Sequence, residues 1–336
     1  MKRNGRIIIL GVLMLLISGV FPGAALWARD LMIYHGEPIP SELETVYTRG
    51  LAWLAANQQE NGSWRGQRGT EPGVVGMALM ALMARGDDPN HGPYSTHIRR
   101  GLDYILSHTH TETGYIGSSM YNHGFATLAL AEAYGAVNDP RLGPALQKAV
   151  ALILSAQAAN PTGGWRYMPT SQDADTTVSG GILMALLAAR NAGISVPDRS
   201  IERAIRLIAS NQTAAGGFGY SSPSSTTPAS SAIGALMLAM TQNNRDQAYL
   251  AALRFVEQTG FNLGRYPYYY LYYASQALFH GNMQIWNRWS AANLAQLAAQ
   301  QSSDGHWQGG EGEAFCTSAA LLSLALYYRY LPIYER

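Results

Sequence analysis

The sequence contains a single cysteine, Cys316, and few charged residues. One cysteine cannot form an intramolecular disulfide, so no disulfide framework holds this fold. Charged residues make up 13% of the 336 positions, and the formal net charge is +1. No basic run follows the N-terminus. These absences exclude the electrostatic footprint of a nucleic-acid-binding protein, so we expect no nucleic-acid partner.

The first residues form a segment of different character. Lys2, Arg3 and Arg6 precede an apolar run over residues 7–20, and small residues follow at 22–25. This order predicts a signal peptide within the first 28 residues, and hence a secreted or periplasmic protein. An uncleaved membrane anchor is the alternative, because the extended apolar run approaches the length that spans a bilayer. Either way, we expect membrane contact only through this segment.

A short pattern recurs along the rest of the chain: Gln, a few polar residues, Gly, and then an aromatic residue. Its copies are Gln58-Gly62-Trp64, Gln157-Gly164-Trp165, Gln212-Gly217-Phe218 and Gln301-Gly305-Trp307, with a weaker copy at Gly114-Tyr115. The first four aromatic positions lie roughly 50 residues apart, which is typical of an array of supersecondary units. Gly permits a sharp turn after a helix, Gln can bond helix-end groups, and the aromatic ring can cover the joint. We interpret these residues as structural fasteners.

Two kinds of helix alternate around these turns. Helices with one polar face are predicted at residues 43–57, 97–107, 144–156, 201–211, 246–258 and 285–299. Helices that are apolar all round are predicted at residues 74–84, 124–134, 177–191, 229–240, 268–279 and 314–328. Six pairs, with the apolar helices inside, predict an all-α protein with a single α/α toroid over residues 29–336. An open solenoid is the alternative.

The repeated turn, with six helix pairs around it, resembles the QW repeat of squalene and oxidosqualene cyclases. More broadly, residues 43–330 resemble the toroid of terpenoid cyclases and prenyltransferase β subunits. Gly163-Gly164-Trp165 is followed by Asp173-Ala174-Asp175-Thr176-Thr177, which is similar to the Asp-x-Asp-Asp-Thr motif of squalene-hopene cyclases. The resemblance implies that Asp175 is the catalytic acid and Asp173 its partner, although Thr176 replaces the family's fourth-position Asp.

The same segment has a simpler interpretation. An acidic or hydroxyl side chain just before an apolar helix is favoured as its N-cap. Asp173, Asp175 or Thr176 would then accept hydrogen bonds from the first amides of the helix. The two interpretations differ in where the Asp175 side chain points: into a cavity, or back onto residues 177 and 178.

The polar and aromatic residues of the apolar helices are the candidates for ligand binding. A run of tyrosines over residues 266–273 enters one inner helix, so some of its rings should face the central cavity and stabilise a carbocation or hold a polar ligand. The candidate substrate-binding residues are Tyr121, His123, Tyr269, Tyr270, Tyr273 and Gln276. The final aromatic segment, residues 327–334, is interpreted as a clamp that packs back on the barrel after Pro332 ends the last helix.

Three functions remain open at this stage. The chain is an isoprenoid cyclase that uses Asp175, a non-catalytic toroid that binds a cavity ligand or a protein, or an enzyme acting on carbohydrates. Zinc-dependent prenyl transfer is disfavoured because Cys316, His280 and His306 have no recognisable ligand spacing. No Gly-Cys-Gly-Glu-Gln segment is present, which disfavours a thioester domain. We predict no metal and no cofactor.

Overall fold

The computed structural model describes residues 39–66, 69–241, 246–261 and 263–334. The predicted signal or anchor, residues 1–28, lies outside the described residues. The chain divides into two units, Met1–Pro40 and Ser41–Arg336. The fold described below is that of the second unit alone.

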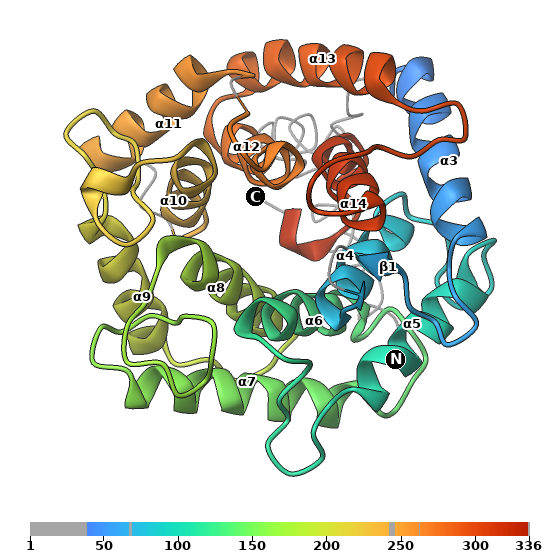
Figure 1. Ribbon diagram of the computed structural model, residues 1–336, viewed down its shortest axis with the longest axis horizontal. Coiled ribbons are helices and arrows are strands. Elements are labelled where there is room, and N and C mark those ends of the chain that lie inside the picture. The colour runs from blue at the N-terminus through green and yellow to red at the C-terminus, as the bar shows by residue number, and fades with distance from the viewer. Residues whose placement is uncertain (1–38, 67–68, 242–245, 262, 335–336) are drawn as a thin grey trace, which may run out of the picture. The chain divides into compact units, whose positions relative to one another are not determined.

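The second unit is all-α and forms an α/α toroid, as predicted (Figure 1). Its outer helices are α3 (Ser41–Ala56), α5 (Ser95–Ser107), α7 (Leu142–Ala159), α9 (Asp198–Ser210), α11 (Gln247–Thr259) and α13 (Met283–Gln300). Its inner helices are α4 (Pro72–Met83), α6 (Met120–Ala133), α8 (Thr176–Asn191), α10 (Pro228–Met240), α12 (Pro267–Gly281) and α14 (Glu313–Leu324). A small antiparallel hairpin, β1 (Arg65–Gly66) and β2 (Gly69–Thr70), precedes α4.

The hydrophobic pattern explains which helices lie inside. Every residue of α4 is buried, whereas α9 buries only one side, with Ile201, Ala204 and Ile208 in the core and Glu202 exposed. Each inner helix packs against the next one in the chain, and α14 packs against α4. The contact of α14 with α4 closes the inner ring, and the contact of α13 with α3 closes the outer ring (Figure 1).

The Gln side chains of the repeated turns join neighbouring outer helices. In each of the four turns, the Gln Nε2 donates to a glycine carbonyl of its own turn and to a carbonyl near the start of another outer helix. The second acceptors are His97 O on α5 at 2.9 Å, Ser200 O on α9 at 2.9 Å, Ala248 O on α11 at 2.7 Å and Val46 O on α3 at 2.9 Å. These side chains therefore link successive units, a role that the predicted bonding of helix-end groups did not include.

The aromatic residues of the four turns are buried against the preceding outer helix. Trp64, Trp165, Phe218 and Trp307 are at most 2% exposed. The indole N–H of each tryptophan donates to a carbonyl of the outer helix that precedes it, at 2.7 to 2.9 Å. The prediction that these rings cover the joints is confirmed.

In the weaker copy of the turn, the buried side chain is that of the residue after Tyr115. Ile116, and not Tyr115, is fully buried, and its backbone N–H donates to His123 Nδ1 on the following inner helix at 3.1 Å. The same bond, to a hydroxyl at the corresponding position, is made by Trp165 to Ser179, Phe218 to Ser231 and Trp307 to Thr317. Our alignment of Tyr115 with the turn aromatics was wrong, because the buried position is the second residue after the turn glycine, as in Gly62-Trp64 and Gly305-Trp307, and Ile116 occupies it here.

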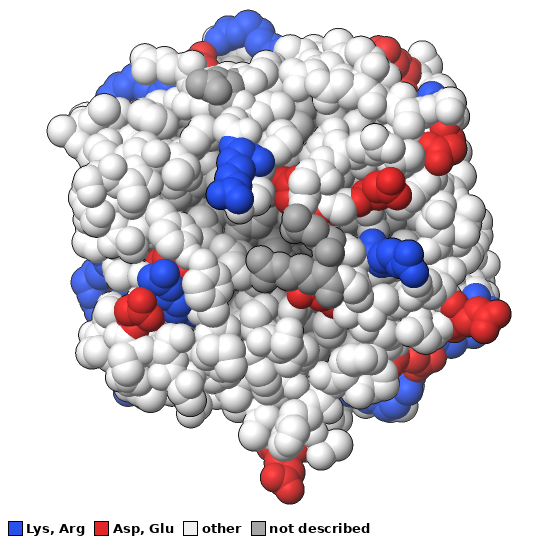
Figure 2. Space-filling view, in the orientation of Figure 1, with Lys and Arg blue, Asp and Glu red and all other residues white. Residues whose placement is uncertain are grey.

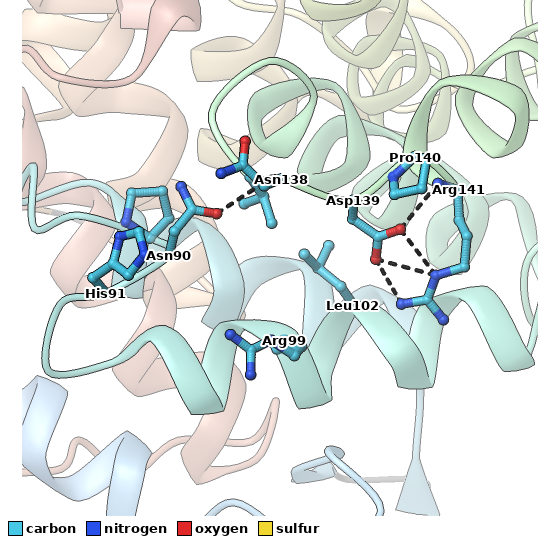
Figure 3. A pocket seen from close by; sticks show the side chains of 10 residues that line it. Asn90, His91, Arg99, Leu102, Asn138, Asp139, Pro140 and Arg141 are labelled. Atoms are coloured by element: carbon cyan, nitrogen blue, oxygen red, sulfur yellow. Dashed lines mark hydrogen bonds and ion pairs between the residues drawn. The ribbon is translucent and has the colours of Figure 1, made fainter.

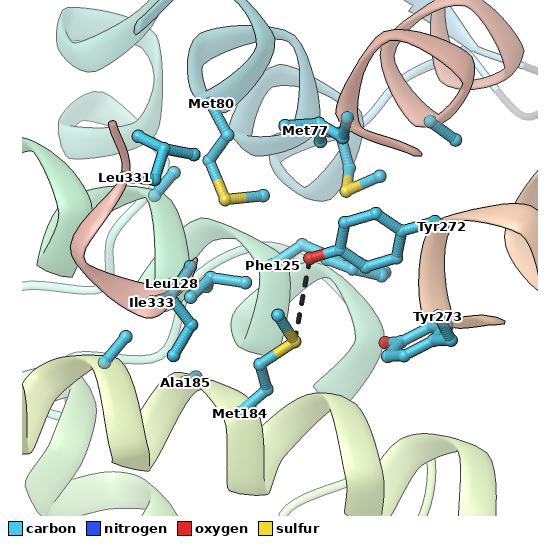
Figure 4. Close-up of a cluster of buried hydrophobic side chains, with 14 of the residues drawn as sticks. Met77, Met80, Phe125, Leu128, Met184, Ala185, Tyr272, Tyr273, Leu331 and Ile333 are labelled. Carbon is cyan, nitrogen blue, oxygen red and sulfur yellow. Dashed lines mark hydrogen bonds between the residues drawn. The ribbon is translucent and has the colours of Figure 1, made fainter. Parts of the chain in front are cut away.

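The end of the chain fills the centre of the ring at the C-terminal ends of the inner helices. Leu331, Ile333 and Tyr334 are each 2% exposed, and the Ile333 N–H donates to the buried Glu132 carboxylate at 3.4 Å. In Figure 4, Leu331 of this segment lies beside Met80 of α4, and Ile333 lies near Ala185 and Met184 of α8. We call residues 331–334 the C-terminal plug.

The packing of this tail agrees with the predicted clamp, but the helix before it is shorter than expected. The last helix, α14, ends at Leu324 and continues as a 3-10 turn over Ala325–Tyr327. Arg329 then adopts a φ of 52°, which redirects the chain toward the centre. The helix therefore ends before Pro332, which instead begins a second 3-10 turn.

Charged side chains are sparse on the face shown in Figure 2, where acidic and basic residues are interspersed among uncharged ones. None of the helices in the described parts of the chain combines the length and the hydrophobicity needed to cross a bilayer.

Candidate functional site

The first turns of the inner helices meet at one opening of the ring. The Tyr121 hydroxyl of α6 bonds Thr177 Oγ1 of α8 at 2.5 Å, and the Thr176 N–H donates to the Tyr220 carbonyl before α10 at 2.8 Å. The Gly73 N–H of α4 donates to Asn122 Oδ1 of α6 at 3.0 Å. We call this opening, made by the first turns and the turns that precede them, the N-terminal mouth.

Asp175 lies in the N-terminal mouth as the N-cap of α8. Its Oδ1 accepts from the backbone N–H of Thr177 and of Val178, each at 2.8 Å, and from the Thr177 hydroxyl at 2.7 Å. This arrangement satisfies two of the amide groups that the start of a helix leaves free. The capping interpretation of Asp175 is therefore confirmed.

The second carboxylate oxygen of Asp175 has no such partner. Asp175 is 0% exposed, and its Oδ2 makes no hydrogen bond of ordinary length with a described residue. The nearest cation is Arg166, whose Nε lies 3.8 Å away. Burial raises the pKa of Asp175, while its amide and hydroxyl donors, the Tyr220 hydroxyl and the Arg166 charge oppose the rise.

Arg166 connects the two predicted carboxylates. Its Nη1 bonds Asp173 Oδ2 at 2.9 Å, so one guanidinium faces both Asp173 and Asp175. The guanidinium also lies over the rings of Tyr167 and Tyr220, 5.3 and 5.5 Å from their centroids. The hydroxyls of these two tyrosines bond each other, and Tyr167 is 44% exposed. We call these three residues the Arg–Tyr stack.

Two of the predicted tyrosines, Tyr121 and Tyr269, lie near Asp175, and Tyr273 adjoins Tyr269. The negative charge of Asp175 contributes to raising the pKa of both Tyr121 and Tyr269, after burial as the main cause. The rings of Tyr269 and Tyr273 meet edge to face at 5.0 Å, and both hydroxyls are buried without a hydrogen bond of ordinary length to a described residue. Phe125 and Phe315 both adjoin the Tyr269 ring, at 6.4 and 6.2 Å, and also each other, at 6.3 Å, so the three rings form one cluster.

The other predicted binding residues lie outside this group. The Tyr270 hydroxyl donates to the Gly260 carbonyl at 2.8 Å, on the outer side of α12. Gln276 is fully buried and its amide donates to the Tyr272 carbonyl. His123 is also fully buried, with Nδ1 accepting from Ile116 and Nε2 donating to the Ala149 carbonyl at 3.1 Å.

The surroundings of His123 keep it neutral. Burial lowers its pKa to about 4, and both ring nitrogens already have partners in neighbouring segments. In three other units a Ser or Thr hydroxyl of the inner helix accepts the hydrogen bond from the backbone N–H of the turn, and His123 takes the place of that hydroxyl here. We therefore leave His123, Tyr270 and Gln276 out of the candidate site.

A second acid, the half-buried Glu311, also lies at the N-terminal mouth, just before α14. Its Oε2 accepts from the Cys316 thiol at 3.6 Å, and burial raises the pKa of both groups. Gly309 makes room for this pair, because a Cβ there would lie 2.8 Å from Cys316 Sγ and 3.0 Å from Glu311 Oε2. The thiol of Cys316 is thus a buried, protonated group rather than a nucleophile.

Arg166 and Tyr220 were not predicted from the sequence. Each follows a turn aromatic closely, since Arg166 comes directly after Trp165 and Tyr220 comes two residues after Phe218. The repeat itself was the available signal, because it places the residues after each turn at the same opening. Among the described residues, no group of three or more His, Cys, Asp or Glu side chains is arranged to hold a metal ion.

These observations define a closed α/α toroid with a polar and aromatic mouth. The chain belongs to the family described as domain of unknown function DUF6288, whose model matches residues 44–265. No curated protein matches the chain.

Several solved structures share the fold. The type II terpene cyclase MstE from Scytonema aligns with a TM-score of 0.58 and 17% identity, over 86% of this chain and 99% of that one. The glycoside hydrolase family 76 mannosidase Bt3792 from Bacteroides thetaiotaomicron aligns with a TM-score of 0.67 and 10% identity, over 86% and 99%. The α-1,6-mannanase of Salegentibacter, in complex with α-1,6-mannotetrose, has a TM-score of 0.63 and 12% identity, over 85% and 99%. At these identities the likeness is one of fold.

Proposed function

We propose that this protein is a binding toroid that holds a neutral, hydroxyl-rich ligand of the oligosaccharide type at its N-terminal mouth. The observation that carries the proposal is a set of buried polar atoms that make no hydrogen bond of ordinary length to a described residue: Asp175 Oδ2 and the hydroxyls of Tyr269 and Tyr273. Leaving such groups unpaired costs about 1–3 kcal/mol each, so a site of this kind favours a ligand that donates and accepts hydrogen bonds.

The Arg–Tyr stack supports the same ligand class. Tyr167 is exposed at the surface of the mouth, and Arg166 is held between two tyrosine rings. An exposed ring offers a flat apolar surface to the C–H face of a sugar, while the neighbouring guanidinium and carboxylates bond its hydroxyls. The Salegentibacter mannanase, which has a similar fold, was solved in complex with α-1,6-mannotetrose, and this supports the choice of mannotetrose as a first probe.

An isoprenoid ligand fits the surroundings less well. A hydrocarbon would leave Asp175 Oδ2 and the tyrosine hydroxyls unpaired, and it would need an apolar cavity of its own length. In this chain Phe125, Tyr272 and Tyr273 occupy the middle of the ring, and the C-terminal plug fills the opposite end.

Acid catalysis by Asp175 is the second candidate function, as the cyclase resemblance implies. Its support is the raised pKa of Asp175 together with an Oδ2 that no described donor occupies. A carboxyl that stays protonated to higher pH can act as a general acid. Incubation with mannotetrose, squalene and shorter polyprenyl substrates, beside the Asp175→Asn variant, tests this role. Product from the parent and none from the variant would support it.

Calorimetric titration with α-1,6-mannotetrose tests the binding proposal. We expect Tyr167→Ala to weaken binding about tenfold, because it removes the stacking surface. Tyr330→Ala is the matched control, since Tyr330 is similarly exposed, at 46%, and packs beside Gly86 at the C-terminal end of α4. Equal affinities of the two variants would contradict the proposal. If mannotetrose does not bind, a panel of neutral glycans is screened, and absence of binding to all of them would reject it.

A further inference from the structure

A separate pocket of about 400 Å³ lies on the outside of the ring, at the opposite ends of the inner helices from the N-terminal mouth (Figure 3). The loop after α4, the first turns of α5 and the loop between α6 and α7 form its walls. Asn90 ties the two loops together, because its Nδ2 donates to the Ala136 carbonyl at 2.9 Å and its Oδ1 accepts from the Asn138 N–H at 2.8 Å. These two hydrogen bonds hold the two loops, and hence the walls of the pocket, in place.

One of the two arginines in the pocket is already neutralised. Arg141 bonds Asp139 through both Nε and Nη2, and its Nη2 lies 2.6 Å from Asp103 Oδ1 as well. Figure 3 shows the Arg141–Asp139 pair at one side of the pocket. Two carboxylates on one guanidinium leave no positive charge for a ligand at this end.

The other arginine, Arg99, lacks its expected partner. Asp103 lies four residues after Arg99 on α5, the spacing at which helical side chains of opposite charge pair. Because Asp103 pairs with Arg141 instead, Arg99 makes no ion pair within 4.0 Å among the described residues. The side chain of Arg99 lies beside Leu102, which is 1% exposed and forms an apolar floor together with Val137 and Pro140.

We propose that this pocket binds a small organic carboxylate with an apolar body. The Arg99 guanidinium pairs with the carboxylate, and the exposed side-chain amide of Asn138 is placed at the rim to donate to it. The apolar body covers Val137 and Pro140, beside the buried Leu102. A single planar guanidinium matches a carboxylate in charge and in shape. A phosphate dianion is disfavoured because Asp139 lines the same pocket.

The test follows the methyl resonances of Leu102 and Val137 by NMR while the full-length protein is titrated. The probes are phenylacetate as a free acid, N-acetyl-leucine as a mimic of a peptide carboxyl terminus, and phenylacetamide as the neutral match of the first. We expect saturable shifts with one or both acids, and binding of phenylacetamide about tenfold weaker, because it lacks the charge that Arg99 recognises.

Two substitutions locate the interaction. Arg99→Gln should weaken acid binding about tenfold, whereas Arg100→Gln, the next and equally exposed arginine of α5, should leave it within about twofold. Equal binding of acid and amide would overturn the proposal, as would wild-type affinity in Arg99→Gln. An absence of shifts with both acids up to about 10 mM would reject the site, since affinities weaker than that contribute less than about 3 kcal/mol.

Discussion

At the scale of single residues, Asp175 divides its two carboxylate oxygens between different tasks. Oδ1 holds the start of α8 through three donors, and Oδ2 faces Arg166 without a hydrogen bond of its own. Capping alone does not require a second carboxylate oxygen that is buried without a hydrogen bond of ordinary length to a described residue. The residue therefore links the stability of an inner helix to the chemistry of the N-terminal mouth.

We expect Asp175 to reduce stability as the pH rises. Because burial raises its pKa in the folded state, the folded protein holds this proton more tightly than the unfolded chain does. Its contribution is favourable below the unfolded pKa of about 3.9 and is lost as the pH rises through the higher folded pKa. Asn cannot ionise and retains the cap. The free energy of unfolding of the parent minus that of Asp175→Asn should thus fall as the pH rises above about 4.

Urea denaturation at several pH values measures this difference. A difference that stays constant, or that grows with pH, would show that Asp175 is not the buried acid whose proton is held in the folded state. At a fixed pH of about 7, Asp175→Ala should be less stable than Asp175→Asn by about 1 kcal/mol, because only Asn replaces the cap acceptor.

At the scale of elements, the repeated turn is a connection between units. Each Gln amide bonds both its own turn and another outer helix, and each indole N–H bonds the helix before it. Gln301 makes this connection from the last turn of the chain to α3, the first helix of the ring. The turn thus fixes the spacing of the outer ring wherever it occurs.

Removing one of these amides should loosen one particular joint. Gln301→Ala is expected to cost about 1–3 kcal/mol, because two carbonyls lose their donor, and to speed amide hydrogen exchange in α3. Gln157→Ala should instead speed exchange in α9, whose Ser200 it bonds. Gln300→Ala, an exposed neighbour, serves as the control. Uniform loss of protection over the whole ring in both variants would contradict a local connection.

The helices could be predicted from the sequence because their signals are local. The apolar run at residues 74–84 has no polar face and became α4, while the stripe of Ile201, Ala204 and Ile208 became the buried side of α9. The approach of Arg166 to Tyr220 depends on the curvature of the ring, which joins turns about 50 residues apart. The spacing of Arg166 and Tyr220 in the sequence does not by itself predict this contact.

At the scale of the whole molecule, the ring and its C-terminal plug together enclose the core. The plug residues Leu331, Ile333 and Tyr334 pack against inner helices from different units, and Ile333 bonds Glu132 in α6. The toroid therefore has two unlike openings, one polar and aromatic and the other filled by its own chain.

Deleting residues 331–336 should destabilise the ring by more than about 3 kcal/mol, since burial of each large apolar side chain contributes about 1.5–3 kcal/mol. Thermal unfolding at matched concentration measures this change. Pro332→Ala is the control, because Pro332 is exposed within the same segment and its loss should cost less than about 1 kcal/mol. A deletion variant as stable as the parent would mean that the plug rests on the core without supporting it.

The closure of α14 against α3 and α4 also constrains how the protein is made. During synthesis α4 emerges early, yet its partner α14 is among the last segments to leave the ribosome, so one apolar side of α4 stays without its neighbour for most of translation. An incomplete ring has no polar cap at either end. Nascent chains that stop before α14 should consequently require chaperones to stay in solution, whereas the finished ring does not.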